Sequence, residues 1–313
     1  PVISGLMCTL FGWRAVFVVP LVGGIVVAAA GVKHVQNVGE RSNTTLDILS
    51  VVLLAAGITA FVYSVGEFST NLIAGIVALF AAIVLLGLFA ARQLKLEHPV
   101  LNVRPMASVR FWPACLLVVV SMMTTFSMSV LLPLYFEGAY GMTALVAGLL
   151  IMPAIACNAV TSIVGGRVMD ARGAWPLLPV GFALIAVGQT AISMTAASMN
   201  IGVVVALTVV VYAGVGLVLS PSQTAGLETL PAAEHPHGTA LLNTWNMIAA
   251  SFGPSLFIGL LSSSAATAGA AGAATDVAQA IGFATAVRVA AVIAVVGFAT
   301  SLVYARRESH MSH

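Results

Sequence analysis

The segment 201–220 reads IGVVVALTVVVYAGVGLVLS and contains no charged residue. A helix of this length rises about 30 Å at 1.5 Å per residue, which matches the hydrocarbon thickness of a bilayer. An apolar run of this length is typical of a transmembrane helix rather than of a helix in a soluble core. The segment therefore predicts that the chain crosses a membrane.

Similar apolar runs occur along the rest of the chain. They lie near residues 15–32, 46–65, 72–90, 112–134, 145–164, 176–194, 239–261 and 283–304. Pro133, Pro153, Pro221 and Pro254 fall in or beside such runs. A proline is tolerated in a transmembrane helix because neighbouring groups satisfy the carbonyls that it frees. We therefore predict an all-α membrane protein with about nine transmembrane helices.

The composition excludes several other classes of protein. Of the 313 residues, 60% are hydrophobic and 7% are charged, whereas a soluble domain has about 25% charged residues. The net charge of +2 is spread over short connections, so we expect no nucleic-acid partner. Cys8, Cys115 and Cys157 lie far apart in the sequence and predict neither a disulfide framework nor a metal framework. The expected surroundings are the lipid bilayer.

Basic residues gather in alternate connections between the predicted helices. One set of connections holds Lys33, Arg41, Arg92, Lys95, Arg104, Arg110, Arg167, Arg172, Arg306 and Arg307, and the other set holds Arg14. Cytoplasmic connections carry an excess of Lys and Arg. We therefore expect a multi-pass protein of the cytoplasmic membrane with a cytoplasmic C-terminus. The connection 262–282 would lie outside, and its Ala, Gly and Ser content predicts a poorly ordered, flexible link.

A glycine-containing motif stands at the expected cytoplasmic end of the run 145–164. Residues 165–173 read GGRVMDARG, which contains the spacing Gly-x-x-x-Asp-x-x-Gly from Gly166 through Asp170 to Gly173. A glycine permits a tight turn, and an aspartate can cap a neighbouring helix N-terminus. The motif resembles the signature cytoplasmic loop of the major facilitator superfamily, with Arg172 as the candidate substitute for the family's basic residues. The resemblance implies a loop that latches one conformation of a transporter.

The first residues of the chain resemble a second motif of the same superfamily. Residues 1–5, PVISG, are similar to the end of the antiporter motif Gly-Pro-x-x-Gly-Gly, with Pro1 and Gly5 as the matching residues. Residues 12–17, GWRAVF, resemble the stretch that leads into the sixth span of these exporters. The antiporter motif lies on the fifth span of the family, so nine further spans imply fourteen. By resemblance, the chain is identified as a member of the fourteen-span drug:proton antiporters.

The resemblance also implies a division of the chain and a missing part. Residues 1–32 would end the N-terminal helix bundle, and 33–108 would hold two inserted linker helices with cytoplasmic connections. Residues 109–306 would form the complete C-terminal six-helix bundle, and 307–313 a cytoplasmic tail. The expected partners include the missing N-terminal helices of the same transporter. The substrate cavity would lie between the two bundles near the bilayer midplane.

Polar residues within the spans are candidates for a substrate pathway, because such groups are costly in hydrocarbon. The candidates are Asn158, Gln189, Asn243, Asn246, Arg288 and Tyr135. The amides can instead join neighbouring helices, the tyrosine can pack in the core, and the arginine can extend to the headgroups. We expect Asp47, Glu67 and Glu137 to be solvated at the ends of spans. The proton-carrying residues are therefore expected upstream of this sequence.

The sequence contains no catalytic motif with a nucleophile and a base at a recognisable spacing. His235 and His237 lie two residues apart in a proline-containing segment and lack a plausible third metal ligand nearby. We therefore predict no catalytic residue, no metal and no cofactor.

The resemblance implies proton-coupled efflux of amphipathic drugs or toxic compounds by alternating access. The partners would then be a small-molecule substrate and protons. Two alternatives are open. One is an exporter of an endogenous metabolite such as a siderophore, a lipid or an antibiotic. The other is a truncated membrane scaffold that does not transport.

Overall fold

The computed structural model describes residues 2–34, 47–67, 71–96 and 99–309, and these residues form helices and no strand. The α-helices are α1 (Val2–Phe11), α2 (Val18–His34), α3 (Ile48–Glu67), α4 (Leu72–Lys95), α5 (Phe111–Tyr140), α6 (Ala144–Arg172), α7 (Leu177–Thr195), α8 (Ile201–Glu228), α9 (His235–Ala270) and α10 (Thr275–Ser309). The 3₁₀ helices are η1 (Trp13–Phe17), η2 (Arg104–Ala107), η3 (Ala196–Ser198) and η4 (Ala232–Glu234). Nine segments of this described part are long and apolar enough to cross a membrane. The predicted all-α membrane protein is confirmed.

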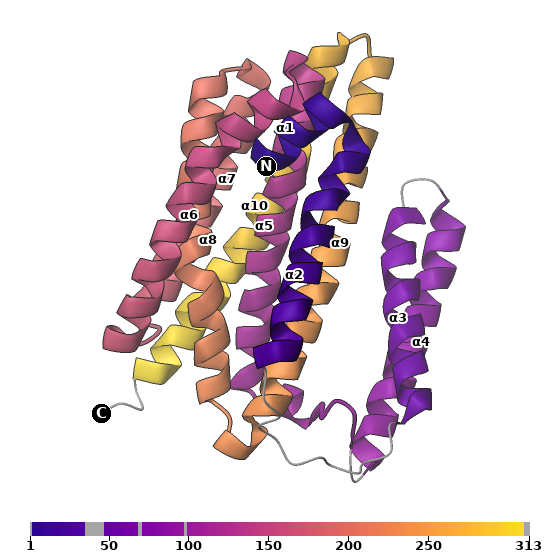
Figure 1. Cartoon of the computed structure of the whole chain (residues 1–313), viewed down its shortest axis with the longest axis vertical. Helices are drawn as coiled ribbons and strands as arrows, with labels where there is room; N and C mark the ends of the chain where they lie inside the picture. Colours follow the sequence, from indigo (N-terminus) through magenta and orange to yellow (C-terminus); the bar gives the residue numbers. More distant parts are fainter. Residues whose placement is uncertain (1, 35–46, 68–70, 97–98, 310–313) are drawn as a thin grey trace.

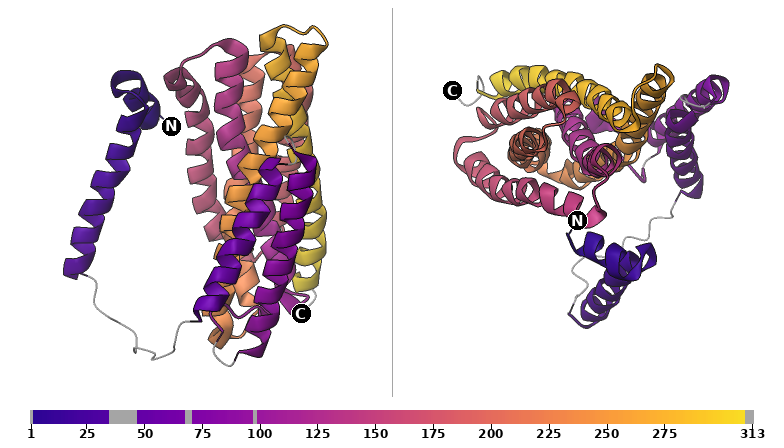
Figure 2. Two further views of the ribbon diagram at one scale, coloured as in Figure 1. Left: turned by 90° about the vertical axis from the view of Figure 1, so that its right-hand side faces the viewer. Right: turned by 90° about the horizontal axis from the view of Figure 1, so that it is seen from above.

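The helices form three groups. Helices α5 to α10 run alongside one another as a six-helix bundle, and α3 and α4 form a hairpin beside it (Figure 1). Helix α1 packs against α6 at one end of the bundle. Figure 2 shows α2 standing away from the bundle. The direction change between α1 and η1 occurs at Gly12, whose φ of 78° is a conformation that glycine adopts without steric cost.

The core of the six-helix bundle combines large aromatic side chains with close helix contacts. Tyr135, Phe182 and Phe283 are completely buried. Helices α6 and α8 approach closely at Gly216, where a Cβ atom would lie 2.7 Å from the carbonyl oxygen of Asn158. Small residues permit such backbone approach in membrane proteins, where dispersion contacts rather than the hydrophobic effect hold helices together. The bundle is therefore held by packing along the whole length of its helices.

The positions of the predicted spans agree with the helices, and the four prolines lie inside α5, α6, α8 and α9. The expected flexible link at 262–282 is wrong, because α9 continues to Ala270 and α10 begins at Thr275. Alanine is the best helix former, so an Ala-rich segment continues a helix when a neighbour covers it. Here a Cβ atom on Gly282 of α10 would collide with the carbonyl oxygen of Leu261 on α9.

The α3–α4 hairpin has a thin interior, in which the buried residues are small or polar except for Phe89. A Cβ atom on Gly57 of α3 would lie 2.7 Å from Cδ2 of Leu86 on α4, so the two helices touch closely at this glycine. The hairpin also contacts the bundle through α3 and α9, where the rings of Phe61 and Phe252 stack with centroids 5.3 Å apart. These contacts fix the hairpin along one side of α9.

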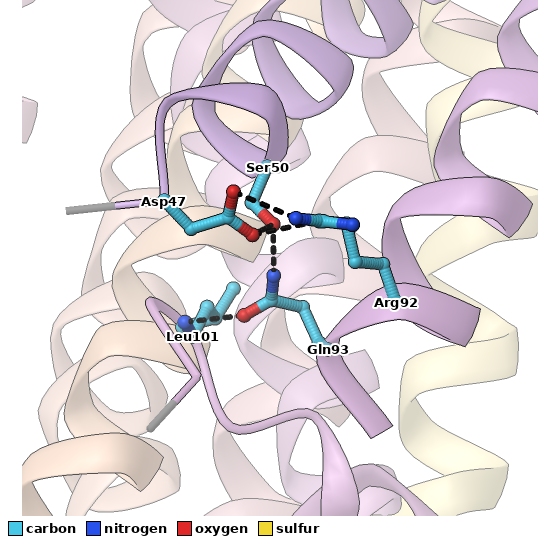
Figure 3. Close-up of polar contacts among 5 residues, drawn as sticks. All are labelled: Asp47, Ser50, Arg92, Gln93 and Leu101. Atoms are coloured by element: carbon cyan, nitrogen blue, oxygen red, sulfur yellow. Dashed lines mark hydrogen bonds and ion pairs between the residues drawn. The ribbon is translucent and has the colours of Figure 1, made fainter. Parts of the chain in front are cut away.

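A chain of polar contacts joins the hairpin to the connection that precedes α5 (Figure 3). Asp47 accepts hydrogen bonds from Arg92, with Nε 2.7 Å from Oδ2 and Nη2 3.0 Å from Oδ1. Ser50 Oγ donates to Asp47 Oδ2 over 2.6 Å and accepts from Gln93 Nε2 over 2.6 Å. Gln93 Oε1 accepts from the backbone N–H of Leu101 over 3.0 Å. We call this chain of contacts the Asp47 network.

The Asp47 network connects to an apolar cluster at the same end of the bundle. Leu101 packs with Phe89 of α4, with Phe111 at the start of α5 and with Leu241 of α9. Ser50 and Gln93 are buried, so their mutual hydrogen bond satisfies groups that would otherwise be costly to desolvate. The hairpin is thus tied to α5 and α9 through one polar and one apolar contact region.

The ion pair with Arg92 lowers the pKa of Asp47. The guanidinium of Arg92 and the hydroxyl of Ser50 both donate to the carboxylate of Asp47, and they lower the pKa of Asp47 from 3.8 to about 2. A bidentate arginine–carboxylate pair is geometrically specific as well as charge-assisted. The aspartate therefore stays ionised in all but strongly acidic solution.

Candidate substrate pathway

A cavity of about 440 Å³ lies between the N-terminal segment and the six-helix bundle. The lining residues are Cys8 of α1, Val16 of η1, Ser129, Pro133 and Glu137 of α5, Ala144, Gly148, Ile151 and Ile155 of α6, and Tyr212 of α8. The cavity is thus built from three parts of the sequence: the N-terminal segment, the consecutive helices α5 and α6, and α8. Its lining is largely apolar with a few polar groups, a composition typical of small-molecule sites.

Local structure at the corner between α5 and α6 positions one wall of this cavity. Helix α5 ends at Gly141, which has a left-handed φ of 63° and donates its N–H to the carbonyl oxygen of Glu137 over 3.0 Å. Helix α6 begins after Thr143, whose hydroxyl accepts from the N–H of Val146. A left-handed glycine and a threonine are the usual end and start signals of helices. This corner brings Glu137 and Ala144 to the same cavity.

Glu137 is the charged side chain among the lining residues that the structure assigns to this cavity. Its side chain is exposed, and it lies in the last turn of α5. Our sequence analysis assigned Glu137 to a solvated span end and did not include it among the pathway residues. A signal was present, because Ser129, Pro133 and Glu137 recur at intervals of four residues and therefore share one face of a helix.

Asn158 lies close to the cavity and joins two helices. Its Nδ2 donates to the carbonyl oxygen of Tyr212 over 3.1 Å, so the side chain connects α6 to α8. Tyr212 lines the cavity, and Ile155 lies about one helical turn before Asn158 on α6. This contact agrees with the alternative that Asn158 joins helices. The residue supports a wall of the cavity through Tyr212.

Two other candidates lie in the interior of the six-helix bundle. Tyr135 is completely buried, donates its hydroxyl to the carbonyl oxygen of Ala196 over 2.8 Å and stacks on Phe283 with centroids 4.2 Å apart. Gln189 of α7 is also completely buried, and its amide has no hydrogen-bond partner among the described residues. Tyr135 thus packs in the core, as the alternative for this residue expects.

The remaining polar candidates lie on α9 and α10. Asn243 is exposed, whereas Asn246 is partly buried and its Oδ1 has no partner within the described ranges. Arg288 is exposed on α10, and Val292 and Val295 continue the same exposed side of this helix. This position is compatible with extension of the guanidinium to the headgroups. The structure therefore does not bring the six predicted pathway residues together, and their roles in transport stay predictions.

The predicted loop motif is mostly helical. Gly166, Asp170 and Arg172 belong to the last turns of α6, and both charged side chains are exposed. Gly173 ends the helix with a φ of 72°, a conformation that favours glycine. Of the other motif, Gly5 lies in α1 and Pro1 lies outside the described residues. The proposed latch stays a prediction.

Comparison with known proteins places this arrangement in a family. Residues 1–254 match the family described as the Major Facilitator Superfamily. The chain is 31% identical to the lincomycin resistance protein LmrB of Listeria monocytogenes over 265 residues, which are 84% of this chain and 56% of that protein. It is 31% identical to the uncharacterized MFS-type transporter YcnB of Bacillus subtilis over 306 residues, which are 96% of this chain and 64% of that protein.

A third relative is named for a different compound, riboflavin. The chain is 23% identical to the riboflavin transporter RibZ of Clostridioides difficile over 259 residues, which are 82% of this chain and 56% of that protein. The chain spans little more than half the length of the lincomycin resistance protein and of RibZ. The family match covers most of the chain and agrees with the helical membrane fold, so this chain belongs to the Major Facilitator Superfamily.

Proposed function

We propose that this chain is part of a proton-coupled exporter of amphipathic drugs or toxic compounds in the cytoplasmic membrane. The observation that carries the proposal is the cavity between the N-terminal segment and the six-helix bundle. In an alternating-access transporter, the substrate site lies at the interface of two bodies that rock against each other. The name of the lincomycin resistance relative supports a drug as the substrate.

The chemistry of the cavity supports an amphipathic compound, cationic or neutral. Isoleucines and a proline provide apolar contact, and Ser129 and the Tyr212 side chain offer hydroxyl groups. Glu137 adds a carboxylate that can pair with a cationic group of the compound. We therefore place a contact with cationic substrates at Glu137, while the proton-carrying residues are expected upstream of this sequence.

The division of the chain follows from the same mechanism. Residues 109–306 would move as one body against the N-terminal bundle to which 1–32 belong, while 33–108 supply the linker helices. The basic residues at the ends of α4 and α6 would face the cytoplasm, as would the C-terminus. Asp170, exposed at the end of α6, would contact the N-terminal bundle in one of the two conformations.

A second candidate function is the export of an endogenous metabolite. The riboflavin transporter among the relatives favours it, because that protein is named for a natural metabolite rather than a drug. An assay of the full-length protein with both classes of compound distinguishes the two functions. A protein that transports neither class would support a membrane scaffold.

The test is proton-driven efflux by the full-length protein in proteoliposomes, with a cationic dye, lincomycin and riboflavin as the compounds. We expect Glu137→Gln to reduce dye efflux by roughly twofold to fivefold, the effect of losing about 0.5–1 kcal/mol from an exposed charge interaction. The matched control is Asp276→Asn, which removes an exposed carboxylate from the first turn of α10. Full activity of Glu137→Gln, or the same loss in Asp276→Asn, would contradict the proposed substrate contact at Glu137.

A further inference from the structure

A second hollow lies at the other end of the six-helix bundle, where α5 begins and α8 ends. It is a groove of about 750 Å³. The lining residues are Val109, Arg110, Trp112, Pro113, Glu228, Thr229, Ala299, Thr300, Val303 and Tyr304. We call it the helix-end groove. It shares no lining residue with the cavity at Glu137.

The walls of the helix-end groove are apolar and exposed. Trp112 is 44% exposed and Val303 is 56% exposed, so large apolar surfaces face the groove or its surroundings. The hydroxyl of Tyr304 donates to the carbonyl oxygen of Ala225 over 2.9 Å, which fixes α10 against α8 beside the groove. An apolar channel with fixed walls between helices fits a hydrocarbon chain.

Two opposite charges stand in the lining of this groove. Arg110 directly precedes the first residue of α5, and Glu228 is the last residue of α8. Both side chains are exposed, and they form no ion pair with each other within 4 Å in the described structure. Because the two charges do not neutralise each other, one ligand that carries a negative and a positive group can pair with both.

The position of the groove relative to the membrane indicates what kind of ligand it binds. Arg110 and Glu228 stand at the ends of membrane-spanning segments, which is the level of lipid headgroups. Tryptophan is enriched at this level because its ring is amphipathic, and Trp112 lies there as well. A ligand at this place presents its polar part to the helix ends and its apolar part to the groove.

We propose that the helix-end groove binds a phospholipid whose headgroup contains a phosphate and a primary ammonium, as in phosphatidylethanolamine. Arg110 binds the phosphate, since its guanidinium donates in a planar fork that suits phosphate oxygens. Glu228 accepts hydrogen bonds from the ammonium. One acyl chain lies along Trp112, Ala299 and Val303. This inference does not depend on the proposed transport function.

The test uses the fluorescence of Trp112 in the full-length protein reconstituted in nanodiscs. Lipids with brominated acyl chains quench a tryptophan that they contact, and the difference between the unmodified protein and Trp112→Phe isolates the signal of Trp112. We compare brominated phosphatidylethanolamine with brominated phosphatidylcholine, whose quaternary ammonium has no N–H to donate. We expect half-maximal quenching of Trp112 at a lower mole fraction of phosphatidylethanolamine.

Two variants assign the headgroup contacts. Glu228→Gln should remove the preference for phosphatidylethanolamine, and Arg110→Gln should weaken binding of both lipids by roughly threefold to tenfold, as for one lost hydrogen bond at an exposed site. Arg167→Gln, which changes an exposed arginine on α6, is the control and should leave quenching unchanged. Equal quenching by the two lipids in the unmodified protein would overturn the proposal, as would an unchanged preference in Glu228→Gln.

Discussion

The six-helix bundle and the α3–α4 hairpin are both built from apolar helices of transmembrane length, but they are held in different ways. In the apolar parts of the bundle helices, the buried share of residues ranges from 22% in α6 and α9 to 61% in α5 and α7, whereas it is 17% in both α3 and α4. The bundle is held by packing along its whole length. The hairpin is held together by the contact of α3 with α4, which is close at Gly57, and it is attached to the bundle by the aromatic stack at Phe61, the apolar cluster around Leu101 and the Asp47 network. Apolar composition therefore indicates that a helix lies in the membrane. The number of neighbouring helices determines which contacts attach it to the rest of the protein.

The largest effect is expected from overpacking the bundle at Gly216. A side chain at this position would enter the backbone of α6 near Asn158 and Ser162. We expect Gly216→Leu to destabilise the protein by at least about 1–3 kcal/mol, the usual range for overpacking. The measurement is the thermal unfolding midpoint of the detergent-solubilised full-length protein, together with the monodisperse fraction in size-exclusion chromatography.

The hairpin offers the matched control for this change. A Cβ atom at Gly87 of α4 would meet no heavy atom within 4 Å, so Gly87→Leu should leave the midpoint nearly unchanged. Equal destabilisation by the two variants would contradict the distinction between a bundle held by packing and a hairpin held at a few contacts.

A smaller effect is expected from the Asp47 network. Asp47→Asn removes the charge that Arg92 binds, so the hairpin should move more freely relative to α9. Spin labels are attached to cysteines that replace Ile76 of α4 and Ile258 of α9, in a background without native cysteines. Double electron–electron resonance then measures the distribution of distances between the two labels. We expect a broader distance distribution in the variant. Lys95→Gln is the control, because Lys95 is exposed one turn from Arg92.

An unchanged distribution in Asp47→Asn would show that the apolar contacts of Phe61 and Leu101 suffice to hold the hairpin. A change of the same size in Lys95→Gln would assign the effect to the loss of any charge at this end. Either result would remove the Asp47 network from the account of hairpin attachment.

The smallest effect is expected from pH. The pKa of Asp47 is lowered from 3.8 to about 2 in the folded protein, so its contribution is fully present above pH 3.8 and is lost as the pH falls toward 2. The distance distribution between the labels on α4 and α9 should therefore stay constant from pH 7 to pH 5. It should broaden only in strongly acidic solution, and Asp47→Asn should lack this step. Broadening between pH 7 and pH 5 would assign the response to another group.

The sequence predicted the helices well because a membrane helix must satisfy its backbone internally and expose apolar side chains, and both demands are visible in a single run such as 201–220. It did not predict the continuation of α9 and α10 through 262–282. Those residues are weakly apolar, and α10 packs closely against α9 in this region, at Gly282 and Leu261. Such a contact between neighbouring helices is not encoded in local composition.

The candidate site was less predictable than the fold. Polar residues inside spans, such as Asn158 and Gln189, were chosen by their cost in hydrocarbon, but this criterion does not tell which side of a helix faces a cavity. Asn158 lies beside the cavity, whereas Gln189 lies inside the bundle. Glu137 was passed over because it stands near a helix end. Only the packing of α1 and η1 against the bundle shows that this end borders a cavity.

The most direct test of the pathway uses Cys8, which lines the cavity, and Cys157 of α6, which is partly exposed outside the lining. The alkylation rate of each thiol by a maleimide is measured in the full-length protein by peptide mass spectrometry, with and without a saturating transported drug. Our account predicts that the drug slows alkylation of Cys8 and leaves the rate at Cys157 unchanged. An unchanged rate at Cys8 under saturating drug would contradict a substrate pathway between the N-terminal segment and the six-helix bundle.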